Sequence, residues 1–213
     1  NKMSKKLILL DAYALIYRAH FAFIKNPRIN SKGLNTSAIF GFCNSLLEVT
    51  NKFDPSHIGV VFDPPGGSDR EGVFADYKAN RQEMPEDIRK AIPYIFDLLK
   101  AMNIKVEMEE GFEADDVIGT LAKQAEKKGF ETYMMTPDKD FAQLVSPNIF
   151  MYRPSRQGNG IEIWGVDEVK EKFEVDRPEQ VIDYLGMMGD SVDNIPGLPG
   201  VGDKTAKKFL AQY

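Results

Sequence analysis

The hydrophobic pattern of the chain alternates between short apolar runs and longer amphipathic segments. The short runs, typical of buried strands, lie at residues 7–10, 58–62, 104–106 and 131–135. Between them, apolar residues recur at helical spacing within residues 38–53, 85–102 and 113–128. This alternation predicts an α/β fold with a parallel central sheet covered by helices.

Later residues predict a second kind of strand pairing. The elements expected there are a hairpin of residues 149–152 and 161–164, joined by 155–160, and short helices at 166–173 and 178–188. Within the predicted helix 85–102, Pro85 marks the start, whereas Pro93 is expected to break or kink it. Cys43 lies in an apolar helix and is expected in the core.

Nine acidic residues stand where such a fold would bring carboxylates together. Asp11 and Asp63 directly continue apolar runs, so each risks burial without a partner. Parallel strands end at one edge of an open sheet, and sites form at that edge. Many carboxylates cannot stay ionised in one small volume without cations. The sequence therefore predicts a divalent-metal site built from Asp11, Asp63, Glu113, Asp115, Asp116, Asp138, Asp140, Asp190 and Asp193.

Each acidic motif has a simpler interpretation when taken alone. The acids of residues 113–116 could compensate the dipole at the start of a helix. Residues 138–140 fit a turn. The two acids of residues 190–193 would share a face if the segment were helical, or lie in a solvated turn before Pro196. Only their joint occurrence with the strand-end acids favours a metal site.

Composition restricts the metal and the compartment. The chain has one cysteine, Cys43, and two histidines, His20 and His57, so an intrachain disulfide and a thiolate zinc site are excluded. A metal must then be bound by oxygen, which favours Mg²⁺ or Mn²⁺. No apolar run approaches a membrane span of about 20 residues. The start of the chain is too polar for a signal peptide. We expect a cytoplasmic protein without membrane contact.

The net charge of −5 does not argue against a nucleic-acid partner. Setting the nine acids aside leaves 23 acidic against 27 basic residues, and bound cations would shift the balance further. Tyr77, Lys78 and Arg81 place two cations three positions apart beside an aromatic ring. The simple interpretation is a solvated helix face. The functional one is phosphate contact, with Tyr77 available for base stacking.

A glycine-rich turn at residues 197–202 is the most specific short segment. Glycines let the backbone approach an anion closely, and the start of the following helix offers free N–H groups, which suits a DNA phosphate. A dinucleotide fingerprint is rejected because a third glycine and a preceding strand are absent. The DNA-contacting residues predicted here are Gly200, Val201, Gly202, Lys204, Lys207 and Lys208.

These pieces, in this order, resemble the 5′-nuclease domain of bacterial DNA polymerase I, within the flap endonuclease family. The motifs that carry the resemblance are residues 9–11, 61–63, 77–81, 113–120, 138–140 and 189–197. It covers essentially the whole chain and implies a PIN-like nuclease fold with a helical arch, at about residues 68–85. It also implies a C-terminal helix-hairpin-helix element whose hairpin matches residues 198–202. We expect a catalytic domain at residues 1–185 and a truncated hairpin element at 186–213.

The resemblance also implies a reaction. It implies hydrolysis of DNA phosphodiesters near a 5′ end or 5′ flap, as a 5′→3′ exonuclease or flap endonuclease acting in primer removal and repair. Two Mg²⁺ or Mn²⁺ ions about 4 Å apart would generate a hydroxide and stabilise the leaving oxygen. Eight of the nine acids would hold or position the ions, with Asp116 in support. Lys78 and Arg81 match the catalytic cations near the scissile phosphate. A monomer is expected.

Two alternatives remain open, and two departures from the family pattern are visible. A haloacid-dehalogenase-type phosphatase needs an acid two residues after Asp11, where Tyr13 stands. A non-catalytic helix-hairpin-helix module would not need carboxylates that repel DNA. Asp69 and Glu71 add negative charge in the arch region. Pro137 stands where many relatives carry glycine, and Asp138 still falls in place.

Overall fold

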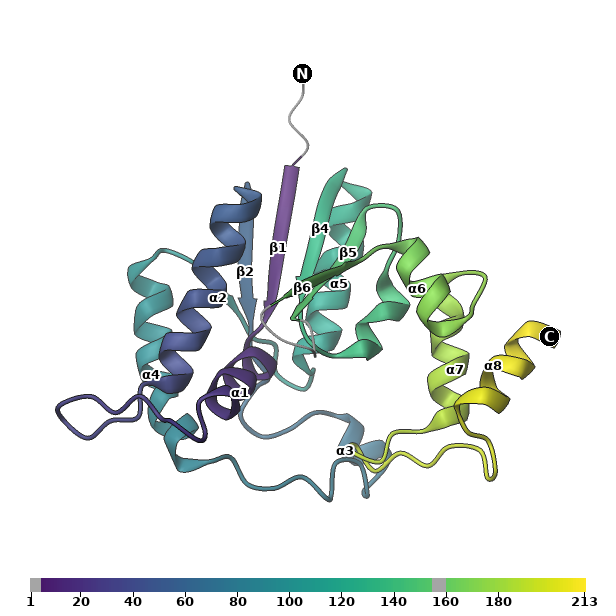
Figure 1. The fold of residues 1–213 in the computed structure, drawn as a ribbon, viewed down its shortest axis with the longest axis horizontal. Helices are drawn as coiled ribbons and strands as arrows, with labels where there is room; N and C mark the ends of the chain where they lie inside the picture. Colours follow the sequence, from purple (N-terminus) through teal and green to yellow (C-terminus); the bar gives the residue numbers. More distant parts are fainter. Residues whose placement is uncertain (1–4, 155–159) are drawn as a thin grey trace.

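A six-stranded sheet forms the centre of the computed structural model, which describes residues 5–154 and 160–213 (Figure 1). The strand order is β3-β2-β1-β4-β5-β6. All pairs are parallel except β5 with β6, which confirms the predicted sheet and hairpin; residues 155–159 of the connection lie outside the described residues. The strands are Lys5–Asp11 (β1), His57–Val61 (β2), Lys105–Glu107 (β3), Phe130–Met135 (β4), Ile149–Pro154 (β5) and Ile161–Trp164 (β6).

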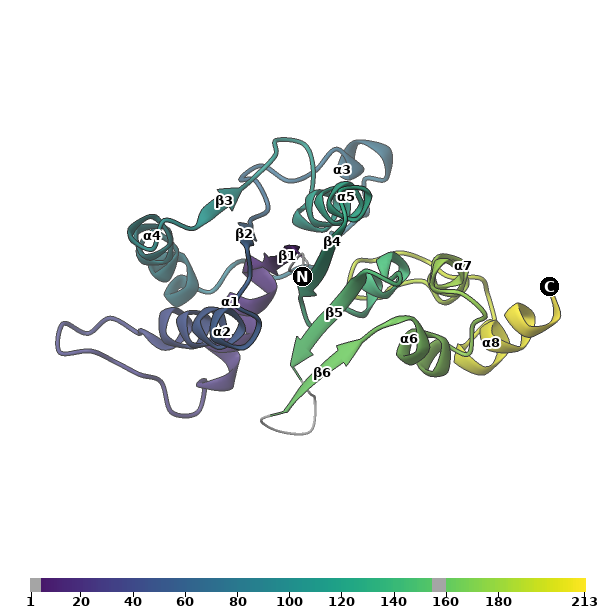
Figure 2. The same ribbon diagram turned by 90° about the horizontal axis from the view of Figure 1, so that it is seen from above.

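Both faces of the sheet are covered, because buried side chains alternate along the central strands. Ile8 and Leu10 point into a core shared with one group of helices, whereas Leu9 joins the core on the opposite face. Burying such a side chain contributes about 1.5–3 kcal/mol. Figure 2 shows helices on both sides of the strands. The first group comprises Ala12–Ala22 (α1), Ser37–Phe53 (α2) and Glu86–Ala101 (α4), and the second face is covered chiefly by Ala114–Lys127 (α5).

One further element lies between β4 and β5, and four follow β6. Lys139–Leu144 (η1) and Pro178–Gln180 (η2) are 3-10 turns, and Val166–Phe173 (α6), Val181–Met188 (α7) and Asp203–Gln212 (α8) are helices. Together with α5 they pack around the second core. No helix among residues 5–154 and 160–213 combines the length and apolar character needed to cross a membrane.

Two expectations about helices need correction, and one helix was missed. Helix α1 was not predicted, although Ala12, Leu15, Ile16 and Ala19 have helical spacing and are buried. Helix α4 runs on through Pro93, so the expected break is wrong. The Pro93 ring is exposed while the opposite side of α4 packs in the core, and this packing holds the helix despite the missing backbone donor. Cys43 is only half-buried, because it lies beside the buried stripe of α2.

The carboxyl ends of the parallel strands face a long crossing segment in Figure 1. This is the predicted arch region, residues 68–85, and it is less helical than expected: only Arg70–Val73 (α3) forms a helix in it. The connection between α7 and α8 approaches the same segment (Figure 1). A Cβ added to Gly189 would lie 2.3 Å from the backbone nitrogen of Gly197, so these two backbones touch in a way that only glycine permits.

Candidate active site

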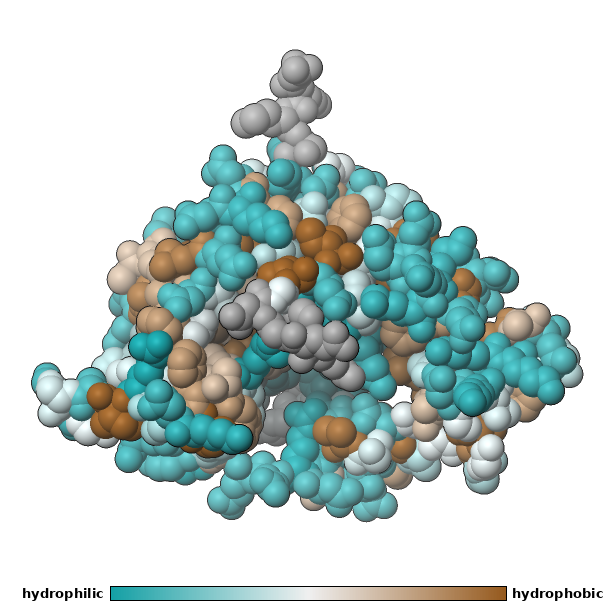
Figure 3. Space-filling model, in the orientation of Figure 1, coloured by the Kyte–Doolittle hydropathy of each residue, from teal (hydrophilic) through white to brown (hydrophobic). Residues whose placement is uncertain are grey.

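A cavity of about 570 Å³ opens beside the carboxyl ends of β1 and β2. Five of the nine predicted acids line it, namely Asp11, Asp63, Glu113, Asp115 and Asp138. Lys78 and Arg81 line it too, as do Tyr13 and Tyr17 of α1. The predicted convergence of acids from distant parts of the sequence is therefore present for these five. The face drawn in Figure 3 is mostly hydrophilic around the lower part of the molecule, where this region lies.

The other four acids lie around this cavity. Asp116 and Asp140 line an adjoining cavity of about 560 Å³, which also includes Asp115. Asp190 and Asp193 belong to the turn after α7. That turn is not helical, so the conditional prediction that they share a helix face does not apply; instead, Asp190 Oδ1 accepts hydrogen bonds from Val192 N and Asp193 N at 2.8 and 3.3 Å.

Asp11 is one of two buried acids of the set, with 8% of its surface exposed, beside Glu113 with 7%. The pKa of Asp11 is raised to about 7, chiefly by burial and also by the charges of neighbouring Asp63 and Asp138, against the hydrogen bond from Thr136. The Thr136 hydroxyl donates to Asp11 Oδ2 at 2.9 Å. A buried carboxyl with a raised pKa, close to other acids, is in the electrostatic state that a bound cation would relieve.

Asp63 connects the end of β2 to the start of α5. Its Oδ1 accepts a hydrogen bond of 2.9 Å from the Ala114 N–H, one of the free donors in the first turn of α5. Asp116 accepts from the Glu113 N–H at 3.3 Å, so it completes the same helix start. The simpler interpretation of residues 113–116, helix-start stabilisation, is thus correct for Asp116 and coexists with the cavity position of its neighbours.

Glu113 receives donors from four residues of the arch region. Lys78 Nζ lies 2.6 Å and Arg70 Nη1 2.9 Å from Glu113 Oε2. The Tyr77 hydroxyl donates to the same oxygen at 3.1 Å, and the Ser68 hydroxyl donates to Oε1 at 2.9 Å. Partial burial alone would raise the pKa of Glu113, but the hydrogen bond and charge of Lys78 lower it. Glu113 is therefore held ionised.

Arg70 bridges three acids of the α5 start. Besides Glu113, its guanidinium contacts Asp116 Oδ1 at 2.7 Å and Asp115 Oδ1 at 3.5 Å. Burial raises the pKa of Asp115, and Arg70 opposes that rise. Arg70 lies between Asp69 and Glu71, which were noted from the sequence only for their negative charge, so the role of Arg70 at the carboxylates was not predicted.

Asp138 and Asp140 start η1 after β4. Asp138 Oδ1 accepts from the Asp140 N–H at 2.9 Å, which agrees with the turn predicted for residues 138–140. The pKa of Asp140 is raised to about 6, chiefly by burial and also by the charges of Asp138, Asp190 and Asp193, against the effect of Lys139. Within the described residues, the buried Oδ1 of Asp140 has no hydrogen-bond partner.

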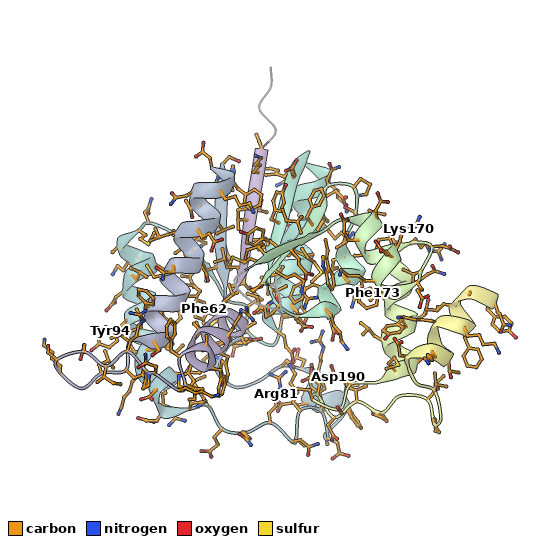
Figure 4. All side chains as sticks on the ribbon, viewed as in Figure 1. Phe62, Arg81, Tyr94, Lys170, Phe173 and Asp190 are labelled. Atoms are coloured by element: carbon orange, nitrogen blue, oxygen red, sulfur yellow. The ribbon has the colours of Figure 1, made fainter. Side chains whose placement is uncertain are left out.

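Arg81 reaches the turn after α7. Its Nη2 lies 2.6 Å from Asp193 Oδ1, and Figure 4 shows labelled Arg81 near labelled Asp190 of the same turn. Each of the three cations Arg70, Lys78 and Arg81 thus pairs with at least one predicted metal ligand. Among the described residues, no three Asp, Glu, His or Cys side chains lie close enough together to hold one ion as they stand.

The carboxylate oxygens of the site are nevertheless the type of ligand that a hard divalent cation prefers. The acids around the two cavities offer oxygen alone, which is what Mg²⁺ and Mn²⁺ prefer. The partnerless buried oxygen of Asp140 and the raised pKa of Asp11 both mark negative charge without sufficient compensation. The residues able to hold ions are thus present, with cationic side chains paired to some of them.

The predicted DNA contacts vary in exposure. Tyr77 has only 8% of its surface exposed and its hydroxyl is bonded to Glu113, so the expected availability for base stacking is not found. In the glycine-rich turn, Gly200 has φ +77°, and Gly200 and Gly202 are exposed, with Val201 half-buried. Of the lysines, Lys204 and Lys208 are exposed, whereas Lys207 pairs with Glu174 and Asp203 at 3.3 Å each.

Several residues of the site carried no usable sequence signal. Ser68, Arg70 and the Tyr77 hydroxyl contact Glu113 because the arch region passes over the start of α5. Local sequence patterns do not reveal such a contact. Thr136 was closer to detection, because a hydroxyl two residues before Asp138 at a strand end is well placed to contact a neighbouring strand end.

Comparison with known families decides the relationship. Residues 6–174 match the family model described as 5′-3′ exonuclease, N-terminal resolvase-like domain, and residues 176–213 match 5′-3′ exonuclease, C-terminal SAM fold. The chain belongs to the 5′-3′ exonuclease family. The predicted resemblance and α/β fold class are confirmed, while the domain boundary at residue 185 stays a prediction.

Individual members of the 5′-3′ exonuclease family are similar over almost the whole chain. DNA polymerase I of Bacillus subtilis is 43% identical over 210 residues, covering 98% of this chain and 23% of the relative. The chain thus spans about a quarter of that polymerase. The 5′-3′ exonuclease of Aquifex aeolicus is 41% identical over 209 residues, covering 98% of this chain and 70% of the relative.

A solved structure supports the fold of this 5′-3′ exonuclease family member. The bacteriophage T5 D15 flap endonuclease, in a pseudo-enzyme–product complex with DNA and metal ions, superposes with a TM-score of 0.74 at 20% identity. The alignment covers 98% of this chain and 75% of the T5 protein.

Proposed function

We propose that this chain hydrolyses DNA phosphodiesters near a 5′ end or 5′ flap, with two Mg²⁺ or Mn²⁺ ions as cofactors. The observation that carries the proposal is the cavity beside the carboxyl ends of β1 and β2, where five acids from four separate segments meet Lys78 and Arg81. Membership of a nuclease family supports the reaction class. The T5 relative in complex with DNA and metal ions supports the substrate and the cofactor.

The acids of the site would hold the ions. Asp11, Asp63, Glu113, Asp115 and Asp138 line the cavity, and Asp140, Asp190 and Asp193 lie within electrostatic reach of one another beside it. When bound there, such ions would supply a hydroxide nucleophile and positive charge beside the leaving oxygen. Asp116 supports the set by fixing the Glu113 N–H and Arg70.

Lys78 and Arg81 would meet the scissile phosphate. Both side chains line the cavity, so a phosphodiester that enters it comes within reach of two cations. Their charges would offset the negative charge that develops as the phosphorus–oxygen bond breaks. Their present carboxylate partners, Glu113 and Asp193, are proposed metal ligands. On binding of substrate and ions, the two cations would therefore leave Glu113 and Asp193 and pair with the phosphate, while the two carboxylates would pair with the ions.

The C-terminal turn would bind the duplex backbone. Gly200 and Gly202 are exposed just before α8, where their backbone N–H groups would meet the phosphates, and Lys204 and Lys208 are exposed on α8. Such contacts carry no sequence information, which suits an enzyme that recognises a DNA structure. We further propose that the chain forms part of a DNA polymerase I acting in primer removal and repair, as a cytoplasmic monomer.

A cleavage assay tests this proposal directly. A 5′-flap duplex and the same duplex without the flap are incubated with excess protein, in Mg²⁺ and in EDTA. We expect metal-dependent cleavage near the junction or the 5′ end. Asp138→Asn should abolish cleavage but retain DNA binding, whereas Asp167→Asn, at an exposed acid of α6, should behave as wild type. Binding without cleavage in Mg²⁺ and Mn²⁺ would instead indicate a non-catalytic DNA-binding module.

A further inference from the structure

Asn194 connects the turn after α7 to the arch region through both ends of its side-chain amide. Its Nδ2 donates to the backbone oxygen of Asp76 at 2.8 Å, and its Oδ1 accepts from Asn80 Nδ2 at 3.2 Å. Beside it, the Lys78 N–H donates to the Asp193 backbone oxygen at 2.9 Å. These three hydrogen bonds attach residues 76–80 to a segment that lies more than 110 positions later in the chain.

The backbone conformations on both sides of this contact are unusual. Lys78 has φ +57° and Asn194 has φ +58°, a region that most side chains avoid. Asparagine tolerates it, whereas a lysine there persists only when its surroundings hold it. For Lys78, the bond from its N–H to Asp193 and the ion pair of its side chain with Glu113 supply that restraint.

The turn that carries Asn194 is itself firmly held. Asp190 and Ile195 exchange two backbone hydrogen bonds of 2.9 and 2.7 Å, which close the turn. Gly189 and Gly197 are in backbone contact, and the Leu198 N–H donates to the Met187 oxygen at 2.9 Å. The position of Asn194 is thus fixed to the end of α7 and to the glycine-rich turn that follows.

We propose that Asn194 is a positioning residue that fastens residues 76–81 over the cavity and so sets the place of Lys78 and Arg81. Asn194 touches neither cation's charged group; it acts through the Asp76 oxygen and the Asn80 amide. The consequence is a mechanical link between the glycine-rich turn and the two cations of the cavity. The catalytic part of this proposal rests on the proposed nuclease function, but the structural part does not.

Amide hydrogen exchange, measured in EDTA without DNA, tests the structural part. The reporter is the Lys78 N–H, whose acceptor is the Asp193 oxygen. In Asn194→Gly, which keeps the left-handed backbone accessible and removes the amide, exchange at Lys78 should accelerate by about 2- to 10-fold, as for the loss of one hydrogen bond. An unchanged exchange rate overturns the proposal, whether or not the chain cleaves DNA.

Two further variants separate the link from a general loss of structure. Asn103→Gly is the matched control, because Asn103 has φ 54° after α4 and its side chain makes no hydrogen bond within residues 5–154 and 160–213. It should leave Lys78 exchange unchanged. Asn80→Ala, at an exposed position, should accelerate the exchange without a change in thermal stability. Its effect and that of Asn194→Gly should not add, because both break the same contact.

Single-turnover cleavage tests the positioning role. At saturating flap DNA, Asn194→Gly should lower the cleavage rate constant by about 10-fold or more while the dissociation constant for duplex DNA stays within about twofold. A purely structural role would leave this rate constant unchanged once the protein is folded. Faster Lys78 exchange with a wild-type rate constant therefore overturns the positioning role. Asn103→Gly should match wild type in both measurements.

Discussion

The Thr136 hydroxyl donates a hydrogen bond of 2.9 Å to Asp11 Oδ2, joining the ends of β4 and β1. The same hydroxyl accepts from the Asp138 N–H at 3.2 Å. Thr136 is completely buried, so its single oxygen orders two acids that approach the cavity from different strands. Neither acid's orientation is independent of this residue.

Removing that hydroxyl should disturb both acids. Thr136→Val keeps the shape but leaves Asp11 without its donor, which should destabilise the chain by about 1–3 kcal/mol. Cleavage should fall about 10- to 100-fold, as for other residues that orient metal ligands. Thr136→Ser retains the hydroxyl and should recover most of the cleavage rate. Urea unfolding in EDTA and single-turnover cleavage measure the two effects; equal rates for the two variants would contradict the role of the hydroxyl.

Asp11 predicts a pH dependence of stability in the absence of metal. Burial raises its pKa from 3.8 to about 7, so the folded chain keeps a proton that the unfolded chain releases above pH 3.8. The stabilisation by this proton is complete at low pH and is lost as the pH rises through about 7. Asp11→Asn does not titrate there. Its free energy of unfolding relative to wild type should rise by up to about 1.4 kcal/mol per pH unit within this window.

Urea unfolding between pH 4 and 9 in EDTA gives this comparison. The matched control is Asp97→Asn, at an exposed acid of α4, which should follow the wild-type pH profile. A constant difference between Asp11→Asn and wild type across the whole range would mean that Asp11 titrates normally in the folded chain.

Lys78→Ala should lower the single-turnover cleavage rate by a factor on the order of 10² to 10³, because it removes a positioned charge from the cavity. Affinity for metal should not fall, since the ammonium pairs with Glu113 and competes for that ligand. Stopped-flow cleavage and metal titration measure these quantities. Lys90→Ala, at an exposed lysine of α4, is the control. A normal rate with weaker DNA binding would reduce Lys78 to a phosphate contact.

Gly202→Ala tests the predicted approach of DNA to the glycine-rich turn. Gly202 has φ −105°, and a Cβ added there meets no atom within 4 Å. Alanine should therefore fit at this position without strain or steric clash. Weaker duplex binding would then report a clash with DNA. The slope of the logarithm of the DNA-binding constant against the logarithm of the salt concentration should become shallower. We expect a change of about 0.9 for each phosphate that the variant no longer neutralises. Titrations at several salt concentrations, with Gly186→Ala as control, measure it; equal affinities would make the turn purely structural.

The sequence predicted those parts of the molecule that depend on local pattern. The strand runs before Asp11 and Asp63 located the carboxyl edge of the sheet, because buried parallel strands are apolar throughout. The five cavity acids follow from that edge. Pro93 was misjudged because local propensity was weighed without the core packing that holds α4.

The contacts of the arch region lay beyond sequence reasoning for a physical reason. Arg70 and Tyr77 reach Glu113 from positions 43 and 36 earlier in the chain, and no periodicity encodes such a distance. Tyr77 was predicted to stack on a DNA base because an aromatic residue beside two cations is typical of nucleic-acid contacts. The sequence does not indicate in which direction the side chain points. Its hydroxyl instead points to the acid, and its ring is buried.

The hydrogen bonds between Asn194 and residues 76–80 also affect the order in which parts of the chain can fold during synthesis. Chains are made from the N-terminus at about 5–20 residues per second, and contacts distant in sequence form late because loop closure precedes them. All six strands end by Trp164, so the sheet can assemble before Asn194 exists. In that interval the arch region lacks its hydrogen bonds to Asn194. A nascent chain should therefore acquire its sheet first, and the geometry around Lys78 only once Asn194 has emerged.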